Sequence, residues 1–301
     1  MKNILVATDL TERSDRAMER AAILAKQLGA SLHIVYIVDD EVSTVIAMAV
    51  EKNATTELRR QVTDAPLFKD VKSHIHVEFG DPWRKTVELA EELDADLVVL
   101  GVHRNRGVRE LFRGTTLHRI AKSCRVPMLV VVERALGIYH NVMVGVDFSE
   151  CARNATVLAA SIADRYPLTL VHAYHIPFKG LITQGAMGGD ISMRETRRIE
   201  AEIAPQMEAF VASLPTPIVD PRVEVVEGGP VAVLRTLAQS QKVDLVCVGS
   251  HAKPWLLETL LGSTAFEVLS YPPCDVLIAP LTAAKTGHGD HDASPNDDKN
   301  Q

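Results

Sequence analysis

Short apolar runs alternate with longer amphipathic segments along most of the chain. Most of the apolar runs lack polar alternation, which is typical of strands buried on both faces of a sheet. In the first half they are Ile4–Ala7, Leu32–Val38, His74–Phe79, Leu97–Gly101 and Met128–Val132. Between them, Ser14–Leu28 and Pro82–Leu93 carry apolar residues at helical spacing. Strands that alternate with helices predict a parallel α/β sheet with right-handed crossovers.

The second half repeats the first. Its strand-like runs are Val142–Val146, Leu168–His172, Val223–Val226, Leu245–Gly249 and Val276–Ala279. Asp9-Leu10-Thr11-Glu12 is matched 138 residues later by Asp147-Phe148-Ser149-Glu150, and Gly101 is matched 148 residues later by Gly249. Because the matched blocks keep their order, the chain is an internal duplication with about ten extra residues inside the second copy. We predict an α/β fold with two tandem, open parallel sheets of five strands, each flanked by helices.

The segment between the two copies sets the predicted boundaries. Residues 134–140 fit neither copy, so we place domains at 1–136 and 137–281. Residues 282–301 contain no large apolar side chain, and we expect a disordered tail there. Val42–Arg60 has the pattern of an amphipathic helix, whereas Phe178–Gly189 is rich in glycine. That second segment is either a loop that closes over a ligand or a disordered connection.

Composition excludes several classes of protein. The 301 residues are 47% hydrophobic and 24% charged, which is ordinary for a globular chain. A net charge of -7 argues against a protein that coats nucleic acid or an anionic membrane. No apolar run is long enough to span a bilayer, and the opening residues lack the pattern of a secretory signal. The four cysteines lack zinc-site or disulfide spacing, so we expect a cytoplasmic protein.

Candidate chemistry lies where the predicted strands end. In an open parallel sheet, ligands bind beyond the carboxyl ends of the strands, where the strand order reverses. In the first half, that edge would gather Asp9, Gly101, Gly114, Thr115 and Thr116; in the second half, it would gather Asp147, Gly249, Gly262, Ser263 and Thr264. Glycines let a phosphate approach the backbone, and the free N–H groups of a helix start attract anions. The alternative is that the same residues form ordinary helix starts, with the aspartates as N-terminal caps.

With these residues, the chain resembles a universal stress protein with two tandem domains, over residues 1–136 and 137–281. The resemblance implies a Rossmann-type fold of the adenine-nucleotide alpha-hydrolase kind. Nucleotide-binding members carry Gly, two residues, Gly, nine residues, and then Gly with Ser or Thr. The outer positions of this motif are intact in both halves, but Arg104 and Ala252 replace the middle glycine. Ala252 adds one methyl group, whereas Arg104 either pairs with a phosphate or blocks the site, so we rank the second half as the better site.

The resemblance also implies contacts for the base and ribose. The aspartate that ends the first strand and backbone groups that end the second strand hold these parts of the nucleotide. They map to Asp9 with Val38 and Asp39, and to Asp147 with Tyr174 and His175. His103 and His251, two residues after the loop-opening glycine, either donate to phosphate or cap the turn. The implied cofactor is ATP, with or without Mg²⁺.

Three classes of function remain. The first is a cytoplasmic, non-catalytic stress-response protein that binds an adenine nucleotide, chiefly in its second half. The second is a stress protein that has lost nucleotide binding and acts through a protein partner. The third is a slow ATPase, but no second carboxylate clearly joins Asp147 to act as a general base. The family pairs through the fifth strand, and a tandem chain can supply both partners itself, alone or within a homodimer.

Weaker candidates lie outside these loops. His74 and His76 share one face of a predicted strand, but the sequence reveals no third metal ligand. Cys124 and Cys274 precede the fifth strands, and we expect both to be buried apolar residues rather than reactive thiols.

Overall fold

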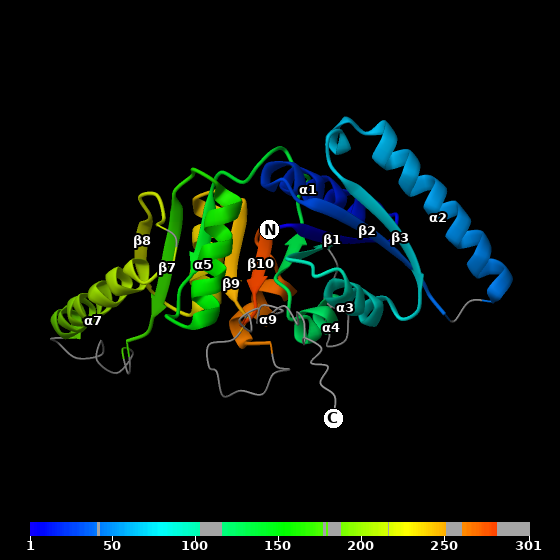
Figure 1. The fold of residues 1–301 in the computed structure, drawn as a ribbon. Helices are drawn as coiled ribbons and strands as arrows, with labels where there is room; N and C mark the ends of the chain where they lie inside the picture. The colour runs from blue at the N-terminus through cyan, green and yellow to red at the C-terminus, as the bar shows by residue number, and fades with distance from the viewer. Residues whose placement is uncertain are drawn as a thin grey trace, which may run out of the picture.

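The computed structural model describes residues 1–40, 43–102, 116–176, 179, 188–215, 217–250 and 261–281. All ten predicted strands are present, and they form one sheet in the order β3-β2-β1-β4-β5-β10-β9-β6-β7-β8 (Figure 1). The strands are β1 (Asn3–Thr8), β2 (Ser31–Val38), β3 (Ser73–Phe79), β4 (Leu97–Gly101), β5 (Met128–Val131), β6 (Val142–Gly145), β7 (Leu168–Tyr174), β8 (Arg222–Glu227), β9 (Leu245–Gly249) and β10 (Asp275–Ala279). Each half is parallel, as predicted, and each reverses its strand order between its first and fourth strands.

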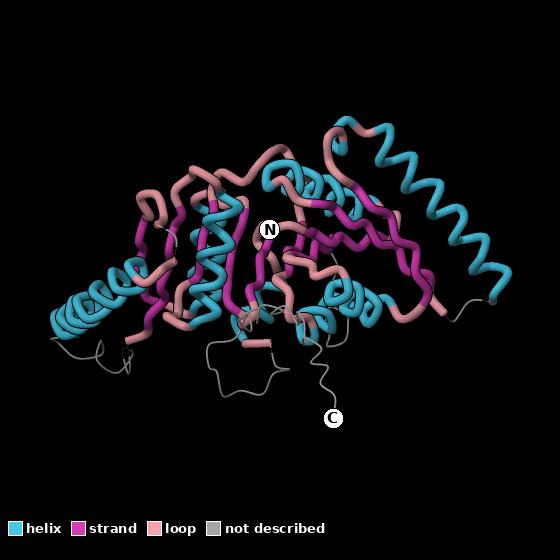
Figure 2. Tube along the Cα trace, viewed as in Figure 1, coloured by secondary structure: helices cyan, strands magenta, loops and turns pink. Residues whose placement is uncertain are grey.

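Helices cover both faces of the sheet (Figure 2). They are α1 (Glu12–Leu28), α2 (Thr44–Asp64), α3 (Pro82–Glu92), α4 (Thr116–Ser123), α5 (Glu150–Ala163), α7 (Gly188–Ala212), α8 (Pro230–Ser240) and α9 (Ser263–Ser270), with a 3₁₀ turn at η1 (Pro66–Phe68). One apolar cluster joins the sheet to α1, α2, α5 and α7, and a second joins it to α3, α4, α8 and α9. Within the described residues, no helix combines the length and hydrophobicity needed to cross a membrane.

Residues at the helix ends explain where the helices begin and end. Asp81 caps α3 by accepting a hydrogen bond from the backbone N–H of Trp83, and Pro82 occupies the first turn. Gly29 ends α1 in the left-handed region at φ 65°, which favours glycine. The amphipathic helix predicted after β2 is α2, which continues beyond the predicted end at Arg60 to Asp64. The glycine-rich segment Phe178–Gly189 lies largely outside the described residues, and the predicted tail lies wholly outside them.

An aspartate anchors the start of the first strand in each half. Asp96 accepts hydrogen bonds from the backbone N–H groups of Lys2 and Asn3. Asp244, its counterpart, accepts them from the N–H groups of His140 and Asn141 at 2.8 and 3.1 Å. The repeated Asp-Leu-Val motif therefore has a structural role, since its aspartate satisfies backbone donors at the amino end of the sheet.

The two halves join through β5 and β10, which pair antiparallel and so make one continuous sheet. The five-stranded parallel sheet predicted for each half is confirmed, and the halves pair through their fifth strands, as the resemblance implies. Without this pairing, each fifth strand would be an exposed edge with unpaired backbone groups. The domain boundary predicted near Leu136 falls in the segment between β5 and β6 and stays a prediction.

A buried polar network holds this junction. The Asp275 carboxylate at the start of β10 accepts hydrogen bonds from the Tyr139 hydroxyl and from the backbone N–H groups of Val132 and Glu133. Arg20 of α1 lies 3.5 Å from the same carboxylate, stacks over the Tyr139 ring and donates to the carbonyl of Gly137. Burial raises the pKa of Asp275, and its hydrogen bonds and the Arg20 charge oppose that rise. The network thus ties α1, the connecting segment and β10 together.

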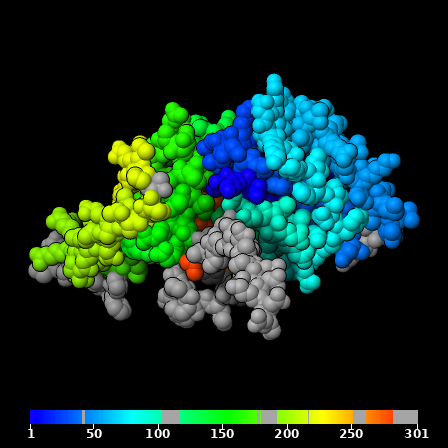
Figure 3. Space-filling view, in the orientation of Figure 1, coloured from blue at the N-terminus to red at the C-terminus, as the bar shows by residue number. Residues whose placement is uncertain are grey.

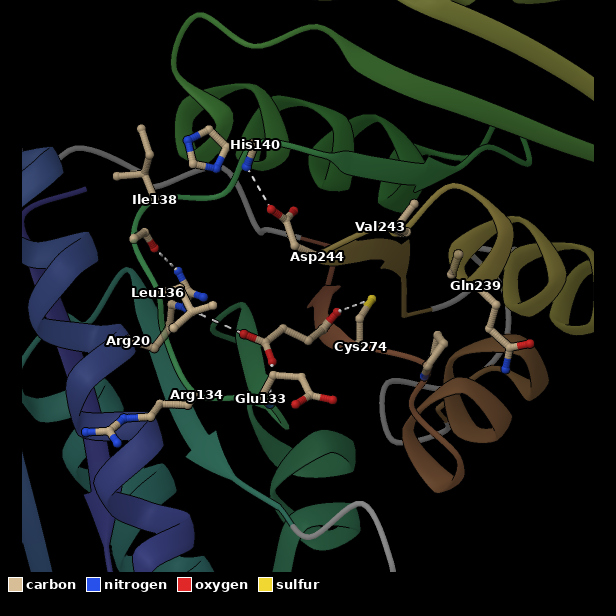
Figure 4. Close-up of a pocket in the computed structure, with 15 residues that line it drawn as sticks. Arg20, Glu133, Arg134, Leu136, Ile138, His140, Gln239, Val243, Asp244 and Cys274 are labelled. Carbon is tan, nitrogen blue, oxygen red and sulfur yellow. Dashed lines mark hydrogen bonds and ion pairs between the residues drawn. The ribbon is translucent and has the colours of Figure 1, made fainter.

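A cavity of about 540 Å³ adjoins this network. Figure 4 shows Arg20 and Leu136 on one side of it, with Asp244 and Cys274 across from them. The space-filling view shows the first half, in blue and cyan, against the second half, in green and yellow (Figure 3). The residues that line the cavity come from α1, from the connecting segment and from the second half, so the cavity lies at their junction.

We expect Asp275→Ala to lower the free energy of unfolding by about 3–5 kcal/mol, because it leaves the buried Arg20 guanidinium and the Tyr139 hydroxyl without their partner. The midpoint of denaturant unfolding measures this loss. Asp64→Ala, at a largely exposed carboxylate of α2 with an ordinary helical backbone, is the control and should change the free energy by less than about 0.5 kcal/mol. A loss of similar size in both variants would contradict the role given to Asp275.

Candidate functional site

Asp9 and Asp147 follow β1 and β6, the strands at which the order of each half reverses. The residue after each aspartate has an unusual backbone: Leu10 at φ 57° and Phe148 at φ 63°. Bulky side chains rarely adopt this left-handed conformation, and strain of this kind clusters at functional sites. β1 pairs with β4 and β6 pairs with β9, so Gly101 and Gly249 end strands that neighbour those of the aspartates.

In the first half, the Asp9 carboxylate is occupied by its own turn. One oxygen accepts hydrogen bonds from the Thr11 N–H and hydroxyl and from the Ser14 hydroxyl, at 3.1, 2.6 and 2.8 Å. The other oxygen lies 3.3 Å from the Arg13 guanidinium. Burial opposes ionisation, but these hydrogen bonds and the Arg13 charge together lower the pKa of Asp9. Thr11, not Asp9, is the N-cap of α1, so the aspartate stabilises the turn from outside the helix.

In the second half, the turn has fewer polar partners. Asp147 accepts two hydrogen bonds, both from Ser149, which itself caps α5 through the N–H of Ala152. Cys151 and Ala152 stand where the first half has Arg13 and Ser14. Both of these side chains are buried, and neither carries a charge. The second aspartate is therefore held by one neighbouring residue, whereas the first is held by three.

Gly101 and Gly249 have a structural reason to be glycine. A Cβ atom on Gly101 would lie 2.3 Å from the carbonyl oxygen of Arg13, and one on Gly249 would lie 2.7 Å from the Cβ of Cys151. In each half, the end of the fourth strand packs directly on the first turn of the first helix. This packing explains both glycines without a ligand, although we predicted them as residues that let a phosphate approach.

The structure brings Gly262 next to the end of β9. Its N–H donates to the carbonyl of Ser250 at 2.7 Å, while the N–H of Ser250 donates to Ala279 at 2.8 Å. Ser263 and Thr264 then form the first turn of α9, which no side chain caps, and Thr116 opens α4 in the first half. Six predicted positions lie outside the described residues: His103, Arg104, Gly114, Thr115, His251 and Ala252.

The residues predicted at the ends of the second strands also lie at this edge. Val38 ends β2 and its carbonyl accepts from Gly80, while Tyr174 ends β7 and its carbonyl accepts from Gly228. The Tyr174 hydroxyl donates to Glu200 of α7 at 3.1 Å. Burial and the neighbouring Glu200 carboxylate raise the pKa of Tyr174. A carbonyl has two lone pairs, so both backbone groups can still accept a second hydrogen bond.

An aromatic cluster beside Asp147 was not predicted. The Phe148 ring lies 4.7 Å from the His172 ring and 6.1 Å from that of Phe210. The Nδ1 atom of His172 lies 2.8 Å from the carbonyl oxygen of Val146. The only signal in the sequence was the Phe at position 148, because His172 and Phe210 come from β7 and α7, far away along the chain.

Three histidines gather in the first half. His74 and His76 of β3 share a face as predicted, and His33 of β2 joins them, a neighbour that the sequence did not reveal. Across the part of the chain that the structure describes, no group of three or more His, Cys, Asp or Glu side chains could hold a metal ion. Cys124 and Cys274 are buried and form no disulfide, so the prediction that both are buried residues is confirmed. Burial raises the pKa of Cys124 to about 11, which disfavours its reactive thiolate form.

Comparison with known families agrees with this architecture. The profile of the Universal stress protein family matches the chain twice, over residues 1–132 and 138–280. The chain belongs to the universal stress protein family. Two relatives are a universal stress protein of Methanocaldococcus jannaschii, 30% identical over 43% of this chain and 81% of the relative, and universal stress protein A homolog 1 of Coxiella burnetii, 31% identical over 36% and 82%.

Two solved structures share the fold over nearly the whole chain. A universal stress protein from Archaeoglobus fulgidus has a TM-score of 0.65 at 15% identity and covers 93% of this chain and 98% of its own. A functionally unknown protein from Pseudomonas aeruginosa has a TM-score of 0.66 at 16% identity, with 94% and 93% covered. At these identities the likeness concerns the fold alone.

We expect Gly249→Ala to lower the free energy of unfolding by about 1–3 kcal/mol, because the added methyl group overlaps Cys151 and the backbone of α5. Gly229→Ala is the matched control, since no atom lies within 4 Å of a Cβ at that position. Urea unfolding of the two variants measures the difference. Equal stability of the two variants would remove the packing explanation for Gly249.

Proposed function

We propose that this universal stress protein binds an adenine nucleotide, ATP with or without Mg²⁺, in its second half, and acts in stress response without turning the nucleotide over. We choose the second half because the two aspartates differ in their contacts. Arg13 neutralises the Asp9 carboxylate, and three side chains occupy it, whereas Asp147 is held by Ser149 alone among the contacts described. A ribose hydroxyl needs a carboxylate oxygen that can still accept a hydrogen bond.

A contact between the end of β9 and the start of α9 supports a phosphate site in the same half. The hydrogen bond between Gly262 and Ser250 brings the start of α9 to the end of β9. The first N–H groups of a helix attract anions, and the Ser263 hydroxyl is available there as a further donor. Asp147, Gly249 and the start of α9 then lie along one edge of the sheet, which is the arrangement that the family motif implies.

The thiols support a cytoplasmic location. Cys124, Cys151, Cys247 and Cys274 are buried, and none of them forms a disulfide. Cysteines outside disulfides are usual in the reducing cytoplasm, so we propose that location. For catalysis, a general base or metal would have to join Asp147, and the described residues around it supply no second carboxylate within its hydrogen-bond network.

A second candidate is a stress protein that acts through a protein partner. The observation in its favour is a set of exposed apolar side chains at the start of α2: Val45, Ile46 and Met48 are 80%, 55% and 64% exposed. Phe79, at the end of β3, is exposed as well. Contiguous apolar side chains on a surface commonly mark contacts with other proteins.

Calorimetric titration of the nucleotide-stripped full chain with Mg-ATP tests the first candidate. We expect one site per chain. Asp147→Ala should weaken binding by about tenfold to a hundredfold, the effect of losing a hydrogen bond to a charged group, whereas the matched Asp9→Ala should leave it unchanged. Gly262→Asp should abolish binding, because it places a negative charge at the start of α9, and Gly114→Asp should not.

Two sites of similar affinity would contradict the ranking of the halves, and no binding at millimolar ATP would overturn the proposal in favour of the protein partner. Release of phosphate that Asp147→Ala abolishes would instead establish an ATPase.

A further inference from the structure

The three histidines of the first half form a compact cluster on one face of the sheet. The Nδ1 atom of His33 lies 3.1 Å from the Nε2 atom of His76, which is a hydrogen bond between two imidazoles. The His33 ring also stacks on that of His74, with 4.9 Å between centroids. His33 and His74 occupy paired positions on β2 and β3, so the cluster spans the contact between the edge strand and its only neighbour in the sheet.

The hydrogen bond sets a limit on the charge that the cluster can carry. One nitrogen must donate a proton and the other must accept it, so at least one of the two rings is neutral. If both rings are protonated, two N–H donors face each other at a distance where neither finds an acceptor. Acid therefore turns an attractive contact between β2 and β3 into a repulsive one.

The charges around the cluster do not remove this effect. Burial and the charges of His76, His74 and Lys72 lower the pKa of His33 from 6.5 to about 4. Burial and the His74 charge also lower the pKa of His76, and Glu78 on the same strand opposes that shift. Lys85 of α3 lies 4.0 Å from the Glu78 carboxylate and forms an ion pair with it, so His76 and Lys85 share this negative charge. On the β1 side, His33 is paired with Leu5, which carries no charge.

The second half has no such cluster. At the positions of β7 and β8 that correspond in register to His33, His74 and His76, it carries Thr169, Arg222 and Glu224. Thr169 is buried, and Glu224 accepts a hydrogen bond from Gln241. The same sheet therefore contains one outer strand with a histidine cluster and one without it.

We propose that the His33–His74–His76 cluster is an acid-sensitive contact that holds β3 against β2 at neutral pH and releases it when the cell interior acidifies. When β3 loosens, a histidine regains its ordinary affinity for a proton. The closed contact is therefore fully favoured above about pH 6.5 and loses its advantage as the pH falls toward 4. His33 and His74 lie near the amino ends of β2 and β3, so acid acts on the outer strand pair of the first half from that end.

Hydrogen exchange of the full chain at about pH 7.5 and pH 5, corrected for the intrinsic exchange rate, tests this proposal. A group with a pKa of about 4 when closed and 6.5 when open favours opening by up to about 30-fold over that interval. Since the rings are partly exposed, we expect protection of the β3 amides, residues 73–79, to fall about tenfold or more. Protection of the β8 amides, residues 222–227, should change by less than about twofold.

The triple variant His33→Thr/His74→Arg/His76→Glu gives the first half the residues that the second half uses in the same register. It should keep its β3 protection at pH 5. His33→Gln, which keeps a polar side chain but cannot titrate, is the milder variant if the triple variant does not fold, and it should lose most of the pH effect. An equal fall in β3 and β8 of the wild type, or an unchanged fall in either variant, would overturn the proposal.

Discussion

The Asp275 carboxylate lies at the junction where the two halves become one sheet, and its burial constrains everything around it. A carboxylate that is 1% exposed needs partners, and it receives them from β10's neighbours, from the connecting segment and from α1. Once it is satisfied, β5 and β10 can pair edge to edge. That pairing removes an exposed edge from each half. Because it is antiparallel, the carboxyl edges of the two halves lie at opposite ends of the strands.

The network is present once, not twice. Pro127 precedes β5 where Asp275 begins β10, and Leu158 of α5 corresponds to Arg20 of α1. A two-fold arrangement of equal halves would need no such asymmetry. A single chain does, because the segment from β5 to β6 must cross the junction on one side only. Arg20, Tyr139 and Asp275 satisfy the polar groups of that crossing in a region where water is excluded.

Elsewhere, the duplication keeps the positions that support packing and varies those that do not. The anchors Asp96 and Asp244 persist, as do Gly101 and Gly249, since each fulfils a steric or hydrogen-bonding requirement of the fold. Arg13 and Cys151, in contrast, occupy equivalent positions with different chemistry. The histidine cluster of β2 and β3 has no counterpart in β7 and β8. Such differences let two halves with the same architecture respond to different signals. Under our proposals, the second half responds to a nucleotide and the first half responds to acidity.

Periodicity and repeated motifs determined the ten strands, their parallel order within each half and the position of the aspartates at the strand ends. These features depend on which residues are buried locally, and a sequence records burial directly in its pattern. Tertiary structure alone decided that Arg20, Tyr139 and Asp275 form a network at the junction of the halves. It also decided that Gly101 and Gly249 pack on the first turns of α1 and α5, and that His33 completes a cluster with His74 and His76. Each of these features depends on contacts between segments far apart along the chain. How closely those segments approach depends on how the strands and helices pack, which no local sequence pattern encodes.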